Sequence, residues 1–163
     1  MTISCLSTDQ EAAQKKFDLV RQSVDTNFTA QISLMERFAT AMEMRKKGFI
    51  LGISSVAGDR GRGSNYIYGA SKAAITTYLS GLRNRLNKFG VQVLTVKPGF
   101  VSTAMTADLD LYPLLTATPE RVAQDIYRAQ QKGKTNLYTP WFWQEIMLII
   151  RCIPESIFKR LSL

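Results

Sequence analysis

Phe49-Ile-Leu-Gly-Ile53 is a short, almost continuous run of apolar residues that ends in two serines. Strands buried on both faces of a parallel sheet have this composition. Val91-Gln-Val-Leu-Thr-Val96 is a second run of the same kind, and Pro98-Gly99 stops it. Thr135-Asn-Leu-Tyr-Thr139 predicts a third, shorter strand. These runs predict the centre of a parallel sheet.

Helical patterns lie before and between these strands. Residues 10–47 predict one helix, which opens with a capping box of Thr8 and Glu11. Its apolar side chains recur at steps of three or four residues: Phe17, Val20, Val24, Phe28, Ile32, Met35, Phe38 and Met42. Residues 66–88 predict a second helix, whose apolar stripe is Ile75, Tyr78, Leu79, Leu82 and Leu86.

The C-terminal third continues the alternation of helices and strands. Thr118 followed by Pro119 predicts the start of a third helix, and residues 104–117 before it predict an irregular apolar loop. The alternation predicts an α/β layer structure with a mainly parallel sheet. The 163 residues suit a single domain, with an irregular start at 1–9 and an apolar, basic tail at 141–163.

The composition excludes several catalytic mechanisms and indicates where the protein is located. The sequence has no histidine, so it cannot form a Ser-His-Asp triad, a Cys-His pair or a His-ligated metal site. The two cysteines, Cys5 and Cys152, form no C-x-x-C, and no apolar run approaches the ~20 residues that span a bilayer. With no signal-peptide pattern at the start, we expect a cytoplasmic protein and no metal site.

The net charge of +8 is concentrated in the middle of the chain. Residues 45–103 hold 10 basic and 1 acidic side chains, a net charge of +9. The N-terminal segment before them carries −2, and the C-terminal segment after them carries +1. Such a block predicts either an anionic partner or a solvated basic surface.

Tyr68-Gly-Ala-Ser-Lys72 is the sharpest chemical feature, because side chains four residues apart share a helix face. A free tyrosine has a pKa near ~10 and is a poor base at neutral pH. An ammonium ~4 Å away, at an effective dielectric of ~20, favours the phenolate by about 4 kcal/mol. That energy corresponds to a pKa lower by roughly three. The pair therefore predicts a tyrosine that exchanges a proton with an alcohol or ketone.

Several motifs occur around this pair in a fixed order. Ser55 follows the first strand, Asn27 lies in the preceding helix, and Pro98-Gly-Phe-Val-Ser-Thr103 follows the second strand. In this order, with Tyr68 and Lys72, they resemble the short-chain dehydrogenase/reductase family. The resemblance implies a Rossmann-like, doubly wound parallel sheet and hydride transfer between NAD or NADP and a small-molecule carbonyl or alcohol substrate.

The resemblance also implies roles for the matching residues. Tyr68 would be the catalytic acid/base, and Lys72 would lower its pKa and bind the nicotinamide ribose. Ser55 would polarise the substrate carbonyl, and Asn27 would hold a water behind Lys72. The nicotinamide side would be lined by Pro98, Gly99, Val101 and Thr103.

The family's nucleotide-binding half, a strand followed by a Gly-rich turn and a helix, has no counterpart in this sequence. The one Gly-rich stretch, residues 58–63, does not match G-x-G-x-x-G. We therefore expect the C-terminal catalytic portion of a reductase, without the N-terminal βαβαβ part. Its preference for NAD or NADP stays open, and we expect weak or no binding of either cofactor by this chain alone. Three alternatives remain: a truncated and inactive fragment, a half completed by another chain, or an oligomerisation and interaction module.

Two further resemblances concern the substrate and the partners. Residues 54–62 and 153–161 are similar to the branch of the family that holds the decaprenylphosphoryl-keto-ribose reductases, which implies a keto-sugar on a lipid phosphate. The family uses helices corresponding to 10–47 and 66–88 for dimer or tetramer contacts, so we expect a homo-oligomer. The tail at 141–163 also suits peripheral membrane contact.

Nucleic-acid binding through Arg60, Arg62 and Lys88 is an alternative of a different class. We expect no nucleic acid as a partner, because the reductase interpretation accounts for the same residues in their order.

Overall fold

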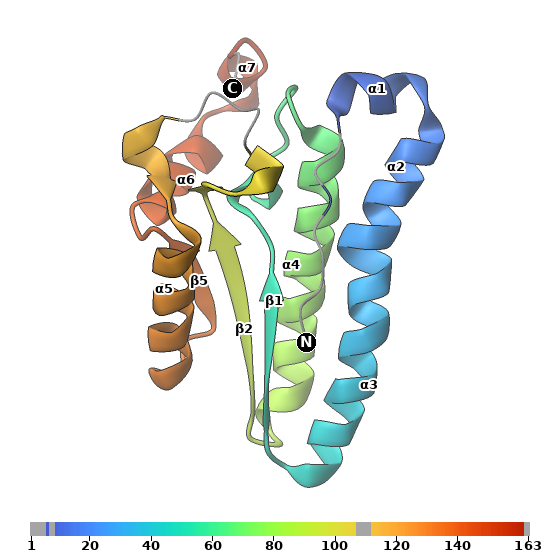
Figure 1. Cartoon of the computed structure of the whole chain (residues 1–163), viewed down its shortest axis with the longest axis vertical. Coiled ribbons are helices and arrows are strands. Elements are labelled where there is room, and N and C mark those ends of the chain that lie inside the picture. The colour runs from blue at the N-terminus through green and yellow to red at the C-terminus, as the bar shows by residue number, and fades with distance from the viewer. Residues whose placement is uncertain (1–5, 7–8, 107–111, 162–163) are drawn as a thin grey trace.

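The computed structural model describes residues 6, 9–106 and 112–161, and it confirms an α/β fold (Figure 1). The helices and strands, in chain order, are α1 (Gln10–Lys15), α2 (Phe17–Val24), the π-helical turn η1 (Asp25–Thr29), α3 (Ala30–Arg45), β1 (Gly48–Ile53), η2 (Val56–Gly58), α4 (Tyr66–Asn87), β2 (Val91–Pro98), β3 (Phe100–Val101), η3 (Ala104–Thr106), η4 (Pro113–Leu115), β4 (Thr116–Ala117), α5 (Pro119–Gln131), β5 (Asn136–Thr139), α6 (Trp143–Cys152) and α7 (Glu155–Phe158).

Three strands form the predicted parallel sheet, in the order β1-β2-β5. Ile53 of β1 lies opposite Val96 of β2, and Pro98 of β2 lies opposite Thr139 of β5. The carboxyl ends of all three strands therefore lie at one edge of the sheet, where α/β proteins place their ligands. A second, small parallel pair joins β3 to β4.

Helices cover both faces of the sheet. α3 and α4 pack on one face around a buried core of Met35, Ala39, Ile50, Ile75, Leu79, Leu82, Leu86, Val91 and Val93. α5 packs on the other face, where the buried residues are Leu94, Val96, Ala129 and Leu137. Figure 1 shows α3 and α4 on the right of the strands and α5 on the left. The predicted stripe of the second helix therefore lies in the core, with Tyr78 at its edge.

The prediction of one uninterrupted helix over 10–47 is wrong. Lys16 adopts an extended conformation (φ −131°, ψ 98°), which separates α1 from α2. The predicted capping box is also replaced, because Asp9 accepts hydrogen bonds from the backbone N–H groups of Glu11 and Ala12. Thr8 lies outside the described residues.

The π-helical turn changes which face of this segment is buried. An extra residue in a turn rotates all later side chains relative to those before it. The side chains that become buried occur at every fourth residue and are mostly small or polar: Ser23, Asn27, Gln31, Met35 and Ala39. Three members of the predicted apolar stripe, Phe17, Val24 and Phe38, are instead 70%, 37% and 46% exposed.

The other predicted boundaries differ by a few residues. β2 continues through Pro98, two residues beyond its predicted end. The Thr118 side chain caps α5 by accepting from the N–H of Arg121, as predicted. The predicted loop at 104–117 contains two short 3-10 turns and β4, and residues 107–111 lie outside the described part. The tail folds into α6 and α7.

Candidate active site

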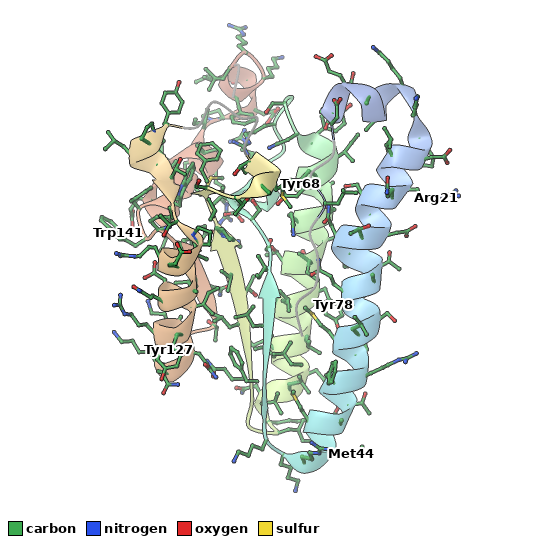
Figure 2. All side chains as sticks on the ribbon, in the orientation of Figure 1. Arg21, Met44, Tyr68, Tyr78, Tyr127 and Trp141 are labelled. Atoms are coloured by element: carbon green, nitrogen blue, oxygen red, sulfur yellow. The ribbon has the colours of Figure 1, made fainter. Side chains whose placement is uncertain are left out.

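Tyr68, which is labelled in Figure 2, and Lys72 lie one turn apart near the N-terminus of α4. The Lys72 side chain has no exposed surface, and its Nζ lies 5.6 Å from the centre of the Tyr68 ring. The same Nζ donates a hydrogen bond to the carbonyl oxygen of Ile53 at 3.1 Å. The structure thus joins the predicted acid/base pair to the last residue of β1.

A side-chain network fixes the backbone at Lys72. The hydroxyls of Ser54 and Thr76 both donate to the Lys72 carbonyl oxygen, at 2.9 and 3.0 Å, and they lie 2.6 Å from each other. A Cβ at Gly58 would lie 2.7 Å from the Lys72 carbonyl carbon, so a side chain there would push η2 away from α4. Ser54 and Thr76 were not predicted as site residues, although the serine pair that ends a buried strand was a signal.

Ser55 lies in the turn after β1, at the same edge of the sheet. Its Oγ accepts from the backbone N–H of Ala57 at 3.1 Å, and its side chain is partly exposed. That bond orients the Ser55 hydroxyl and occupies a lone pair rather than the proton. The hydroxyl proton therefore stays available to an oxygen placed at the sheet edge.

Asn27 lies at the middle of the π-helical turn and is fully buried. Its Oδ1 accepts from the backbone N–H of Leu6 and its Nδ2 donates to the carbonyl oxygen of Leu6, both at 2.8 Å. The amide thus holds the chain at Leu6 against the turn. π-helical turns inside α-helices occur frequently at functional sites.

The residues predicted for the nicotinamide side lie around the end of β2. Pro98 ends this strand, and Val101 pairs with Ala117 between β3 and β4. The Gly99 N–H donates to the carbonyl of Thr139, and a Cβ on Gly99 would lie 1.9 Å from the Trp143 indole nitrogen. Gly99 is therefore required by the packing of α6.

Thr103 lies beyond β3 and is exposed. Its backbone N–H donates to the Thr106 hydroxyl, which in turn donates to the carbonyl of Val101. Thr103 is the most exposed of the predicted nicotinamide-side residues.

A buried polar cluster that the sequence analysis missed lies beside this edge. Asp59 accepts from Lys97 Nζ at 2.5 Å and from the Tyr138 hydroxyl at 2.6 Å. Burial raises the pKa of Tyr138, and the hydrogen bond and charge of Asp59 raise it further. A lysine at the end of a buried strand, in a segment with only one acidic residue, was the signal that pointed to Asp59.

The next residue, Arg60, holds the C-terminal helices. Its guanidinium donates to the carbonyls of Ile150 and Ile153, both at 2.6 Å, and to Glu155 at 2.9 Å. It also lies 3.7 Å from the centre of the Phe158 ring. Asp59 and Arg60 therefore tie the loop after Ser55 to β2, β5 and both C-terminal helices.

The described residues contain neither a membrane-spanning helix nor a metal-binding cluster. No helix within residues 6, 9–106 and 112–161 is long and apolar enough to cross a membrane. The same residues include no group of three or more acidic or cysteine side chains placed to hold a metal ion.

The comparisons with known proteins agree with this architecture. A family model described as short chain dehydrogenase matches residues 3–112. The chain belongs to the short-chain dehydrogenase/reductase family.

Among its relatives is an uncharacterized oxidoreductase of Mycobacterium tuberculosis, 38% identical over 138 residues, an alignment that covers 85% of this chain and 55% of the relative. The chain thus spans little more than half the length of that relative.

Two solved structures share the fold. A short-chain dehydrogenase from Burkholderia cenocepacia, in complex with NADP, gives a TM-score of 0.77 at 22% identity, over 88% of this chain and 61% of that one. A 4-hydroxyisoleucine dehydrogenase complexed with NADH gives a TM-score of 0.72 at 20% identity, over 83% of this chain and 63% of that one.

Proposed function

We propose that this chain carries the proton-transfer and nicotinamide-side part of an NAD(P)-dependent oxidoreductase, which moves a hydride between the cofactor and a ketone or alcohol. The environment of Lys72 is the observation that carries the proposal. This buried ammonium has three N–H donors. In the described part of the chain it makes one hydrogen bond, to the carbonyl of Ile53. A buried cation with so few acceptors requires further partners.

A nicotinamide nucleotide fits this donor set. Its ribose hydroxyls would accept from the remaining donors of Lys72, and Pro98, Gly99, Val101 and Thr103 would line the nicotinamide ring. The Burkholderia neighbour holds NADP and the 4-hydroxyisoleucine dehydrogenase holds NADH, so both cofactors are candidates. When bound, the cofactor supplies or accepts the hydride.

The chain's own residues would move and hold the proton. Tyr68 donates its phenolic proton to the substrate oxygen as a ketone becomes an alcohol, and the Lys72 cation stabilises the phenolate that remains. Ser55 would donate a hydrogen bond to the same oxygen, which orients and polarises it without transfer of the Ser55 proton. Asn27 fixes the π-helical turn. A water held at this turn would relay protons to and from Lys72.

The proposed substrate is a keto-sugar carried on a lipid phosphate. Two segments support it by their similarity to the decaprenylphosphoryl-keto-ribose reductases, residues 54–62 and 153–161. The exposed apolar side chains of Leu114 and Trp141 add support, since they belong to the segments that flank β4 and α6.

The proposed protein partner is a second copy of the chain. Phe17 and Phe38 on α2 and α3 are exposed, which favours contact through these helices and α4. The same contact supports the second candidate function, an oligomerisation module without turnover. Nucleic acid is not proposed, because the Arg60 guanidinium is engaged with α6 and α7.

Cofactor titration and turnover separate these functions. Binding of NADPH or NADH to the purified chain is followed by nicotinamide fluorescence, and ketone reduction by loss of nicotinamide absorbance. We expect Tyr68→Phe to abolish turnover and to leave cofactor binding unchanged. Tyr66→Phe removes an exposed hydroxyl from the same turn and should retain both activities.

The opposite results are equally informative. Wild-type turnover by Tyr68→Phe would exclude the acid/base role. A wild-type chain that binds neither cofactor but self-associates would favour the oligomerisation module.

A further inference from the structure

Exposed apolar side chains gather on the elements near the C-terminus. We call this surface the apolar end, and it consists of Tyr112, Leu114, Trp141, Leu148, Ile149, Ile157 and Leu161. Leu114 is 92% exposed and Trp141 is 70% exposed. Figure 1 shows α6 on the side of the sheet away from α2 and α3 and α7 above the carboxyl ends of the strands, and Figure 2 shows Trp141 directed outward on the side of α6.

Hydrogen bonds join the elements of the apolar end into one continuous body. The Trp143 indole N–H donates to the carbonyl of Leu115, which attaches η4 to α6. Arg60 bonds both the end of α6 and the start of α7. The exposed side chains therefore belong to packed elements rather than to separate loops.

α6 is apolar on two opposite faces. Its inner face buries Trp143 and Met147 against Val56. Its outer face presents Leu148 and Ile149, which are 57% and 67% exposed. A surface helix normally presents polar residues outward, whereas the outer face of α6 carries Leu148 and Ile149 beside the exposed Gln144 and Glu145. The outer face of α6 therefore has the composition of a contact surface.

Positive charge borders the apolar end. Lys159 and Arg160 follow α7, are exposed and take part in no ion pair within the described residues. Of the nearby carboxylates, Glu155 is paired with Arg60 at 2.9 Å. Glu145, on the outer face of α6, is the exposed acid that opposes an anionic partner.

We propose that the apolar end inserts into the interfacial layer of a bilayer that contains anionic lipids. Tryptophan and tyrosine favour the level of the headgroups, because one end of each ring is apolar and the other is polar. Leucine and isoleucine side chains enter the acyl boundary, and lysine and arginine contact anionic headgroups. This combination distinguishes a bilayer from a purely apolar protein partner.

Docking would also set the orientation of the candidate active site. Arg60 holds α6 and α7, and Asp59 beside it holds the ends of β2 and β5. Both residues lie in the loop that begins at Ser55. The rigid link would hold the Ser55 turn at a fixed height above the membrane. The docking itself needs no cofactor and does not rest on the proposed reaction.

Vesicle sedimentation of the purified chain tests the proposal. We expect binding to phosphatidylcholine vesicles that contain phosphatidylglycerol, and much weaker binding to phosphatidylcholine alone. The double variant Leu148→Gln/Ile149→Gln should lose at least tenfold in affinity. Each of Lys159→Gln and Arg160→Gln should lose roughly fivefold at low salt. Glu145→Gln should bind more tightly, because it removes repulsion from the headgroups.

The matched control is Phe17→Gln/Met44→Gln, which removes two side chains of similar exposure from α2 and α3, outside the apolar end. It should leave vesicle binding unchanged, and circular dichroism checks that each variant is folded. Absence of vesicle binding, or an equal loss in the control, would overturn the proposal. Light scattering gives a second way to overturn the proposal. If the wild-type chain is a dimer in buffer and the Leu148→Gln/Ile149→Gln variant is a monomer, a second copy of the chain covers this face.

Discussion

The Lys97 ammonium and the Asp59 carboxylate form an ion pair at 2.5 Å that is almost entirely enclosed, with 10% and 4% of the two side chains exposed. Lys97 belongs to β2 and Asp59 to the loop after Ser55. The other oxygen of Asp59 accepts from Tyr138 of β5. Through this pair, the loop that carries Ser55 is fixed to the strand that leads into Pro98 and Gly99.

Removal of one partner should therefore be costly. Asp59→Ala leaves the Lys97 charge buried without its counterion, and we expect the free energy of unfolding to fall by about 3–5 kcal/mol. Urea denaturation measures the change. In a Lys97→Met background the same substitution should cost much less, because no charge is left uncompensated. An equal cost in both backgrounds would show that the pair does not couple the two residues.

Tyr138 should make the stability of the fold fall at alkaline pH. Burial and the bond to Asp59 raise its pKa above the ordinary value of about 10. The folded state thus keeps the phenolic proton at a pH where the unfolded chain releases it. This contribution is fully present below pH ~10 and is lost as the pH rises toward the folded-state value.

We expect Tyr138→Phe to reduce the loss of stability above pH ~10, measured by urea unfolding at a series of pH values. Tyr127→Phe is the control, since this side chain is 64% exposed. A pH dependence that is unchanged or steeper in Tyr138→Phe would contradict the assignment.

Arg60 should control the order of the C-terminal helices. Arg60→Ala removes hydrogen bonds to the carbonyls of Ile150 and Ile153 and the contact with Phe158. We expect a loss of about 2 kcal/mol and faster hydrogen exchange at the amides of α7. Arg121→Ala removes an exposed pair within α5 and should cost under ~1 kcal/mol. Unchanged exchange in α7 would mean that α7 holds without Arg60.

The sequence predicted the elements whose signal is local. The apolar runs of β1 and β2 predicted a parallel sheet. The four-residue spacing of Tyr68 and Lys72 predicted that both lie on one helix face. The Thr118 cap was likewise correct, because a cap depends on its immediate neighbours.

Other features depend on residues far apart in the chain. Asp59 meets partners 38 and 79 residues away, and Arg60 meets carbonyls 90 and 93 residues away, which no short window reveals. The π-helical turn was missed for a related reason. Periodicity favoured Phe17 and Phe38 for the buried face, whereas tertiary contact with α4 selected Ser23 and Asn27.

Asn27 offers the sharpest test of how the π-helical turn is held. Both ends of its amide bond the backbone of Leu6, so each substitution removes a different part of the contact. Asn27→Ala removes the donor and the acceptor, and we expect the free energy of unfolding to fall by about 2–3 kcal/mol, with faster exchange of the Leu6 amide.

Asn27→Asp keeps the acceptor but places a carboxylate beside the Leu6 carbonyl in a fully buried position, so it should be the more costly change. An ordinary aspartate has a pKa of ~3.9, so raising the pH from about 4 to about 7 favours the ionised carboxylate. This change should destabilise Asn27→Asp and not Asn27→Ala. Ser33→Ala on the exposed side of α3 serves as the control and should be near neutral. Equal stability of the alanine and wild-type chains would show that the π-helical turn is held by its packing against α4 and not by the amide of Asn27.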